Sequence, residues 1–251
     1  MTPVLTIDLN ADLGEQTAES HDDELMQYVT SANIACGGHA GDRDSMTRTL
    51  ELALKYGVAA GAHPGYPDRQ NFGRTTLAIS PAELRTSLTE QIQTLREIAT
   101  QVGIRIGHVK PHGALYHDAN SQEKIARLIA DVVRAIDPSM ALVAQASSAS
   151  LAIYRQCGLT AIAEAFADRR YEPTGKLRDR SLPDALLAPQ EAAAQALGIA
   201  LYQRVTTTGG TLPIAADTLC LHSDTPRAAS IAKSIRTALE QNGVHLQKFT
   251  R

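Results

Sequence analysis

Short apolar runs alternate with longer segments of helical periodicity along the whole chain, and this alternation limits the possible folds most strongly. Strands that alternate with helices form right-handed βαβ crossovers and therefore a parallel sheet. Seven strand-like units without a G-x-G-x-x-G motif after the first favour a closed or nearly closed barrel over a dinucleotide-binding sheet. We predict a single α/β domain, residues 1–251, built as a seven-stranded parallel (β/α) barrel. The predicted strands are residues 4–10, 30–35, 58–63, 105–109, 141–145, 160–166 and 218–222.

Helix boundaries between these runs carry local signals of their own. Ser80 and Glu83 stand in the pattern of a capping box, and a proline follows Ser80 at the first helical position. Residues 167–189, rich in charge and proline, are predicted to form a long βα loop, a kind of segment that often binds ligands. Glycines that commonly end helices stand before three of the predicted strands, at Gly57, Gly103 and Gly158.

Charge and composition exclude several classes of function. The net charge is −3 without a long run of one sign, so neither nucleic acid nor an anionic membrane is an expected partner. No window approaches the length and hydropathy of a membrane span. The three cysteines are scattered and form no C-x-x-C pair, which fits a reducing compartment. Residues 1–8 lack the basic and apolar regions of a signal peptide, and we therefore expect a cytoplasmic protein.

Reactive side chains gather where the predicted strands end. The active site of a parallel barrel forms at the carboxyl ends of its strands and in the loops that follow them. Six of the eight histidines fall in these junctions, all except His21 and His245. We therefore expect Asp12, His63, Lys110 and His112 to face one cavity, with Lys110 close enough to pair with an acidic neighbour or a bound anion.

Ordinary structural roles remain open for several of these residues. Asp12 precedes Leu-Gly and can be the first residue of an Asx-turn, and His63 before a proline can be a structural histidine. Asp42 is expected to be the N-cap of the next helix. Cys220, flanked by apolar residues, is expected in the core. Lys110 is harder to explain in this way, because lysine is rarely placed in a barrel mouth without a partner or ligand.

Motifs at these junctions resemble the LamB/YcsF family, the A subunits of prokaryotic 5-oxoprolinase. They occur in order from one end of the chain to the other, so the resemblance covers nearly all of it. It implies an irregular seven-stranded barrel related to the glycoside hydrolase/deacetylase superfamily. The matching segments are DLNADLGE at 8–15, SANIACG at 31–37, HAGD at 39–42, GAHP at 61–64, YPDR at 66–69, NFGR at 71–74, HVKPHG at 108–113, FADR at 166–169 and CLH at 220–222.

The resemblance implies ATP-dependent hydrolysis of 5-oxo-L-proline to L-glutamate, together with partner subunits B and C. The chain has no Walker motif, so ATP with its Mg²⁺ is expected to be bound mainly by a partner or at an interface. No tightly bound transition metal is expected with this function. A homo-oligomer of the chain is also compatible with it.

The chemistry of lactam opening suggests roles for the candidate residues. The reaction needs a cation for a carboxylate or phosphate, a base for water, and donors for the developing oxyanion. Lys110, with Arg169 as a second candidate, suits the first role; Asp12, His63 or His112 suits the second. Backbone amides of residues 36–38 suit the third. Replacing Lys110 is expected to leave the fold intact. The candidate substrate-binding residues are Asn10, Asn33, Gly37, His39, Glu164, Arg169 and His222.

Three positions depart from the family pattern. Phenylalanine is commoner where Gly38 stands, and the glycine is expected to widen the pocket. Asparagine is common at the position of His117, and glycine is usual at that of Ser223. None of these departures removes a reactive group, so they bear on substrate choice and not on the reaction class.

Two other functions remain as alternatives. Asp12, His39, His63 and His222 can together bind a divalent metal, since Asp and His ligands at strand ends make an open catalytic site. A metal-dependent amide or acetyl hydrolase, like the polysaccharide deacetylases, is therefore the second hypothesis. A non-catalytic binding or scaffold subunit is the third.

Overall fold

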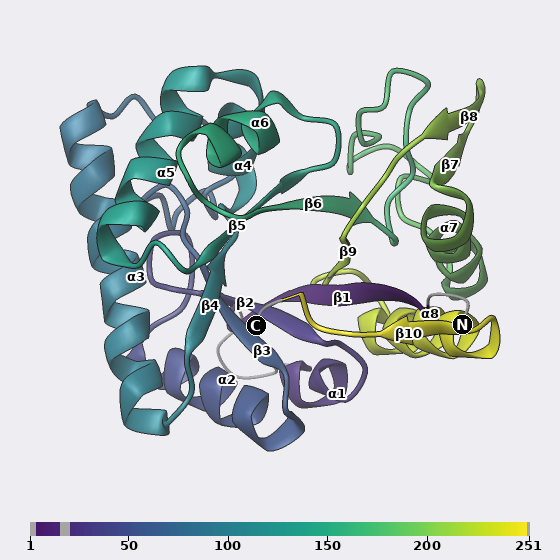
Figure 1. Ribbon diagram of the computed structural model, residues 1–251, viewed down its shortest axis with the longest axis horizontal. Coiled ribbons are helices and arrows are strands. Elements are labelled where there is room, and N and C mark those ends of the chain that lie inside the picture. The colour runs from purple at the N-terminus through teal and green to yellow at the C-terminus, as the bar shows by residue number, and fades with distance from the viewer. Residues whose placement is uncertain (1–3, 16–20, 250–251) are drawn as a thin grey trace.

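Seven parallel strands close into a barrel in the computed structural model of the protein, which describes residues 4–15 and 21–249 (Figure 1). The expectation that residues 1–8 carry no signal peptide falls partly outside the described residues, because residues 1–3 are not described. Neighbouring strands follow the order β1–β2–β3–β4–β5–β6–β9, and β9 pairs with β1 to close the barrel. The predicted seven-stranded parallel barrel is thus confirmed. Its strands are β1 (Leu5–Leu13), β2 (Ser31–Ala35), β3 (Ala59–His63), β4 (Ile106–Val109), β5 (Ala141–Gln145), β6 (Ala161–Phe166) and β9 (Thr218–His222).

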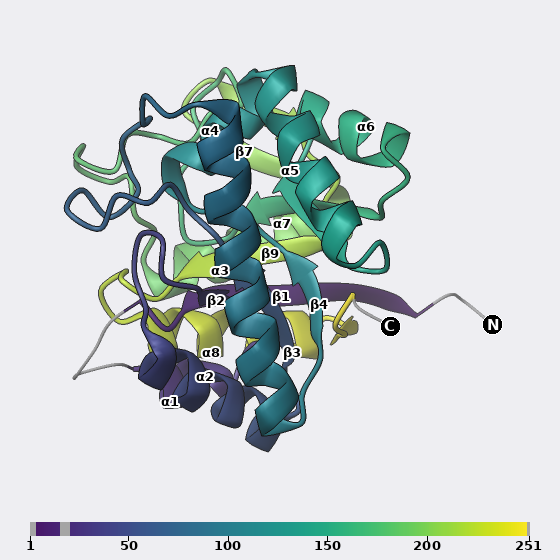
Figure 2. The same ribbon diagram turned by 90° about the vertical axis from the view of Figure 1, so that its left-hand side faces the viewer.

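Helices cover the outside of the barrel, and their ends follow the local signals (Figures 1 and 2). The Ser80–Glu83 capping box begins α3, and left-handed Gly57 and Gly103 end α2 and α3. Asp42 is the N-cap of α2, as predicted. The helices are α1 (Asp22–Met26), α2 (Arg43–Tyr56), α3 (Pro81–Val102), α4 (Gly113–Ser121), α5 (Glu123–Ile136), α6 (Ala149–Gln156), α7 (Pro189–Tyr202) and α8 (Ala228–Gln241).

Three short strands outside the barrel were not predicted. Strands β7 (Arg204–Thr207) and β8 (Gly210–Pro213) form an antiparallel hairpin, seen at the upper right of Figure 1. Strand β10 (Val244–Leu246) pairs with the start of β1. Gly209 lies in the tight turn of this hairpin, and Gly210 begins β8 with a φ of 122°. The irregular connection predicted at residues 167–189 does join β6 to α7.

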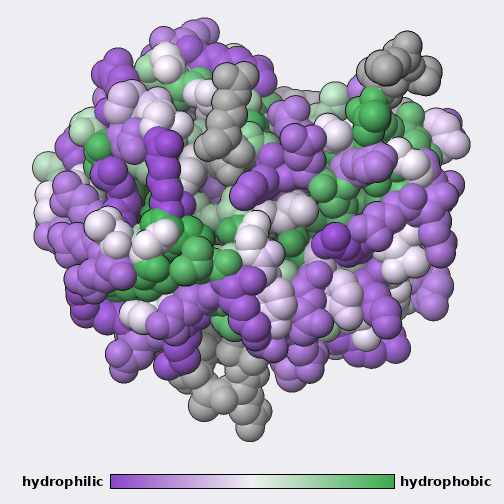
Figure 3. Space-filling view, turned by 60° about the horizontal axis from the view of Figure 1, so that its bottom comes forward, coloured by the Kyte–Doolittle hydropathy of each residue, from purple (hydrophilic) through white to green (hydrophobic). Residues whose placement is uncertain are grey.

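Apolar helix faces pack on the barrel and leave polar faces outside. Leu84, Leu88, Ile92 and Leu95 of α3 are all buried at spacings of three or four residues. On the face shown in Figure 3, hydrophilic residues cover most of the surface and hydrophobic residues form smaller patches between them. No helix within the described residues is long and apolar enough to cross a membrane.

The amino end of β1 brings a carboxyl group into the barrel interior. Asp8 is 1% exposed, and it accepts hydrogen bonds from the hydroxyls of Thr30, Ser31 and Thr218. Thr218 also accepts a hydrogen bond of 2.7 Å from the Asn10 amide. Burial raises the pKa of Asp8 from 3.8 to about 6, although the three hydroxyl donors oppose this shift. Burial at the base of the barrel therefore raises the pKa of this carboxyl group.

This shift predicts a pH dependence of stability. A carboxyl whose pKa is raised by folding contributes stability below its ordinary pKa and loses that contribution as the pH rises through about 6. Between pH 4 and pH 7 the wild type should lose about 2–2.5 kcal/mol of unfolding free energy relative to Asp8→Asn, which cannot titrate. Urea unfolding of both proteins across this range measures the difference. A difference that stays constant with pH would contradict the assignment.

Candidate active site

A cavity of about 970 Å³ opens at the carboxyl ends of the barrel strands. Asp12, His63, Lys110 and His112 all line it, so the structure brings the four candidate catalytic residues together. Residues 174–180 of the long β6–α7 connection form one wall. The remaining candidates that line the cavity are Arg169 and His222.

The Lys110 side chain lies at the centre of this arrangement. It follows β4 directly and is only 3% exposed. Its Nζ lies 2.9 Å from Asp12 Oδ1, 2.8 Å from Glu164 Oε1 and 3.1 Å from Cys220 Sγ. Burial alone would lower the pKa of Lys110, but Asp12 and Glu164 raise it well above its ordinary value. The ammonium is therefore charged and already paired with carboxyl groups, which makes Lys110 a poor receptor for a substrate anion.

Asp12 lies within β1 and not in a turn, because β1 extends to Leu13. Burial alone would raise the pKa of Asp12, but His63 and Lys110 hold it well below its ordinary value. Its Oδ1 also accepts a hydrogen bond of 2.9 Å from the Asn33 amide. Its Oδ2 faces His63 Nε2 at 3.4 Å. Asp12 is therefore ionised, and it lines the cavity with its Oδ2 beside His63.

A polar layer beneath the cavity supports Asp12. The Asn33 amide donates to Asn10 Oδ1 at 2.8 Å, and His108 Nε2 donates to Asn33 Oδ1 at 2.9 Å. Burial lowers the pKa of His108 to about 3, so its ring is neutral. Asn10 and Asn33 are not among the described residues that line the cavity. The structure thus places these two substrate-binding candidates under the site, where they position Asp12.

A second cluster joins three histidines to Glu15, a residue that was not among the predicted candidates. Glu15 Oε1 lies 3.1 Å from His39 Nε2, 3.3 Å from His112 Nδ1 and 3.7 Å from His63 Nε2. His63 Nε2 and His112 Nδ1 are 3.0 Å apart. The His39 and His112 rings stack with centroids 3.6 Å apart. In the sequence, the position of Glu15 at the end of the 8–15 motif was the feature that could have indicated it as a site residue.

Backbone carbonyls fix the orientation of two of these rings. His63 Nδ1 donates to the carbonyl of Lys110 at 2.7 Å, and His112 Nε2 donates to that of Phe72 at 2.9 Å. Phe72 has a φ of 54°, which non-glycine residues rarely adopt. In a neutral imidazole the other nitrogen then carries a lone pair. His63 Nε2 and His112 Nδ1 are those nitrogens, and both point toward Glu15.

The opposite wall of the cavity carries a second ion pair and a buried guanidinium. His222 Nδ1 lies 3.1 Å from Asp168 Oδ2, and its ring stacks on Phe166. Burial alone would lower the pKa of His222, but Asp168 raises it above its ordinary value. Arg169 is 8% exposed and donates from Nη2 to the carbonyl of Arg178. Its Nε has no hydrogen-bond partner within residues 4–15 and 21–249.

The comparisons with known proteins agree with the motifs and the barrel. Residues 7–251 match the family model described as the LamB/YcsF family. This chain belongs to the LamB/YcsF family. Its relatives include proteins named as the A subunit of 5-oxoprolinase from Methylococcus capsulatus, at 49% identity over 95% of this chain and 94% of the relative, and from Chloroflexus aggregans, at 46% identity over 96% and 98%. The resemblance found in the motifs is thus confirmed.

One solved structure shows the same relationship, and a second shows the fold alone. The lactam utilization protein from Thermus thermophilus is 41% identical and has a TM-score of 0.91, with 98% of this chain and 100% of that chain covered. A putative cellobiose-phosphate cleavage protein from Enterococcus faecalis has a TM-score of 0.59 at 12% identity, with 98% of each chain covered. The second protein shares only the fold with this LamB/YcsF chain.

Two expectations about the Gly37–Gly38 segment need correction. The Gly37 N–H donates to the carbonyl of Ala40 at 2.8 Å, so it is not free to bind an oxyanion. Gly37 is also not among the described residues that line the cavity. Gly38 does not widen the pocket, because the Gln91 side chain occupies the space where its Cβ would lie. Gln91 in turn hydrogen-bonds the backbone of Gly65.

The four ligands of the alternative metal-dependent hydrolase, Asp12, His39, His63 and His222, are divided between two clusters. Among the described residues, one set of potential ligand atoms comprises Glu15, His39, His63 and His112, and the other comprises Asp12, Cys220 and His222. In each set the atoms lie within 4.8 Å of one another.

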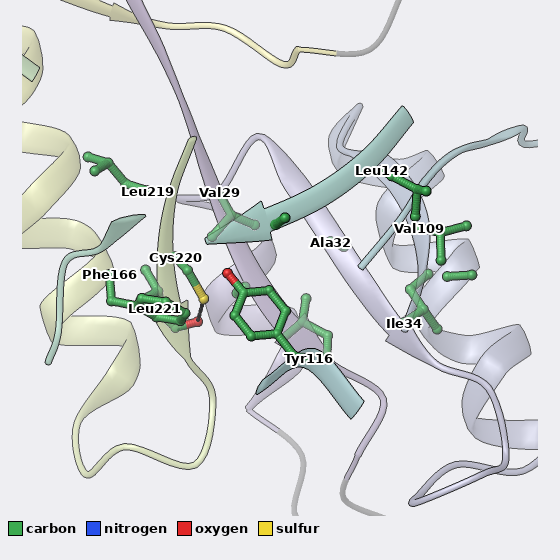
Figure 4. Packing of buried hydrophobic residues seen from close by; sticks show 14 of the residues in the cluster. Val29, Ala32, Ile34, Val109, Tyr116, Leu142, Phe166, Leu219, Cys220 and Leu221 are labelled. Atoms are coloured by element: carbon green, nitrogen blue, oxygen red, sulfur yellow. Dashed lines mark hydrogen bonds between the residues drawn. The ribbon is translucent and has the colours of Figure 1, made fainter. Parts of the chain in front are cut away.

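Cys220 is buried as predicted, but its sulfur also contacts Lys110, and Figure 4 shows its side chain beside the Tyr116 ring.

The buried ion pairs predict a large effect of Lys110 on stability. Lys110→Ala would leave Asp12 and Glu164 buried without their cation, which typically costs about 3–5 kcal/mol. The expectation that this substitution leaves the fold unaffected is therefore revised. Denaturant unfolding should show this loss, and a smaller one in the double variant Lys110→Ala/Glu164→Gln. The exposed Lys233 on α8 is the matched control, and its alanine variant should change stability by less than about 0.5 kcal/mol. A loss below about 1 kcal/mol in Lys110→Ala would contradict the ion-pair assignment.

Proposed function

We propose that this chain is the A subunit of a 5-oxoprolinase, which opens the lactam ring of 5-oxo-L-proline to give L-glutamate. The observation that supports this most strongly is the near full-length similarity to relatives named as A subunits of 5-oxoprolinase. The cavity adds chemical support. It combines an ionised carboxylate, a charged ammonium and a buried guanidinium at the mouth of one barrel.

Arg169 is the residue best suited to bind the carboxylate of the substrate. Arg169 lines the cavity, and the Nε of its charged guanidinium is buried without a hydrogen-bond partner among the described residues. The neighbouring wall is basic, with Arg178 and Arg180 among its lining residues. Those two arginines are already paired with Glu172 and Asp224. Arg169 therefore takes over the anion-binding role for which the sequence first suggested Lys110.

Lys110 and Asp12 suit the reacting end of the lactam. A fixed ammonium in a desolvated site stabilises negative charge that develops on a carbonyl oxygen. Lys110 can do this through its charge alone, without a further hydrogen bond, because Asp12, Glu164 and Cys220 already hold its Nζ in place. Asp12 Oδ2 can accept a hydrogen bond from the attacking water and orient it. The amide is resonance-stabilised, so phosphorylation of its oxygen by ATP would supply the activation that ring opening needs.

The dependence on ATP and on partner subunits is part of the same proposal. A single five-membered ring with one carboxylate fills only part of a cavity of about 970 Å³. The remaining volume and the basic wall can accommodate phosphate groups delivered with Mg²⁺. We expect subunits B and C to carry most of the ATP-binding site and to dock over this mouth. A homo-oligomer of this chain is compatible with such an assembly.

A metal-dependent amide or acetyl hydrolase is the second candidate function. The cluster of Glu15 with three histidines favours it, because imidazole and carboxylate are common ligands of zinc. A non-catalytic scaffold role is the third candidate. Measuring the reaction with and without ATP separates the first two functions, and the Asp12→Asn variant in the reconstituted complex separates a catalytic role from a scaffold role.

Reconstitution tests the proposed function directly. The purified chain alone should release little phosphate from ATP in response to 5-oxoproline, and addition of subunits B and C should restore coupled release of phosphate and glutamate. The physical reason is that this chain supplies the lactam site while its partners supply ATP. Asp12→Asn should lower the reconstituted rate by roughly a hundredfold or more. Full turnover by the chain alone, or by the Asp12→Asn complex, would contradict the proposal.

The role of Arg169 predicts a specific change in substrate affinity. Loss of one charged hydrogen-bonding partner should raise the KM for 5-oxoproline roughly 10- to 100-fold in Arg169→Ala, with a smaller change in Arg169→Lys. The comparison substrate is 2-pyrrolidinone, the same lactam without the carboxylate, which should be affected little by the substitution. Arg134→Ala on the outer face of α5 is the matched control. Equal losses for both substrates would indicate that Arg169 only supports the fold.

A further inference from the structure

We infer that Glu15, His63 and His112 form a binding site for one divalent transition-metal ion of the zinc type, with His39 holding the Glu15 carboxylate in place. This inference goes beyond the proposed function and does not depend on it, since the site can be tested without any substrate. It departs from the expectation that the chain holds no tightly bound transition metal. It also replaces the ligand set of Asp12, His39, His63 and His222 suggested by the sequence.

The spacing of the three ligand atoms fits a common metal ion. Zinc binds nitrogen and oxygen ligands at roughly 2.0–2.1 Å, which places two ligands of a tetrahedral site about 3.3 Å apart. His63 Nε2 and His112 Nδ1 are 3.0 Å apart, and they lie 3.7 Å and 3.3 Å from Glu15 Oε1. These three distances describe a triangle of the size that one ion would require.

The orientation of the rings is the strongest argument for a cation. His63 and His112 each use one ring N–H on a backbone carbonyl, so their facing nitrogens carry lone pairs when the rings are neutral. Two lone pairs 3.0 Å apart beside a carboxylate repel one another unless a positive charge lies between them. A single proton can bridge one of these contacts at a time. A divalent ion would satisfy all three atoms together.

The surroundings of the cluster match those of open metal sites. His39 Nε2 lies 3.1 Å from Glu15 Oε1, and its ring stacks on His112, so it supports two of the ligands. Such supporting residues orient ligands and raise metal affinity. His63 and His112 also line the cavity, and Asp12 Oδ2 lies 3.4 Å from His63 Nε2 on that side. Three protein ligands would leave one coordination position directed to the cavity, as in catalytic sites.

Metal titration of the purified full-length chain tests the inference. After treatment with a chelator and dialysis, the protein should bind one equivalent of Zn²⁺ or Co²⁺, measured by calorimetry and elemental analysis. Bound Co²⁺ should give the visible absorption of a low-coordinate nitrogen and oxygen site. Zn²⁺ should also raise the melting temperature, because it binds only the folded ligand set.

Variants of the cluster separate this site from surface binding. His112→Ala and Glu15→Gln should each weaken binding by more than about 100-fold, and His39→Gln by roughly 10- to 100-fold. His117→Ala is the matched control, because His117 lines the same cavity outside the cluster and its variant should bind metal normally. Melting curves without metal show whether each variant folds, and Glu15→Gln preserves the size of the side chain if His112→Ala does not fold.

Two results would overturn the inference. A wild-type chain that binds no Zn²⁺ or Co²⁺ at micromolar concentration would show that a proton, and not a metal, bridges the two histidines. Unchanged stoichiometry and affinity in His112→Ala and Glu15→Gln would assign the bound metal to surface groups. Neither result bears on whether 5-oxoproline is the substrate, which the reconstituted assay decides separately.

Discussion

A buried ammonium joins the strands of this barrel at their carboxyl ends. Lys110 follows β4, and its partners Asp12, Glu164 and Cys220 come from β1, β6 and β9. Removing a cation from water is costly unless geometry and charge compensate for it, so the four strands must keep their relative register for the ion pairs to form. The shape of the cavity and the direction of its reactive groups depend on this one contact.

The interior beneath Lys110 is polar where many barrels are apolar. A continuous series of hydrogen bonds runs from Asp8 through Thr218, Asn10 and Asn33 to Asp12. Buried networks of this kind specify one arrangement, because each member left without a partner carries a desolvation cost. The apolar core lies instead between the strands and the outer helices. Hydrogen bonds and ion pairs therefore fix the strands near the barrel mouth, whereas apolar packing stabilises the contact between the strands and the outer helices.

The sequence predicted the features that depend on local patterns. The seven barrel strands and the caps at Ser80 and Gly103 follow from periodicity and from backbone preferences of single residues. The grouping of Asp12, His63, Lys110 and His112 followed from one topological rule about strand ends.

Features that depend on distant packing could not be predicted in this way. Gln91 fills the space beside Gly38 from a helix about fifty residues away along the chain. The Glu15 carboxylate meets His63 at the end of β3 and two histidines from loops, and only its position at the end of the 8–15 motif indicated it in the sequence. The hairpin of β7 and β8 is too short to give a clear alternation. The His112 ring direction depends on the left-handed backbone of Phe72, which sequence does not reveal.

Lys110 connects the two halves of the site through different parts of one residue. Its ammonium belongs to the ion pairs with Asp12 and Glu164, whereas its carbonyl accepts the Nδ1 proton of His63. A substitution that shifts the position of this one residue would therefore disturb both the ion pairs of the acidic half and the hydrogen bond that sets the tautomer of His63.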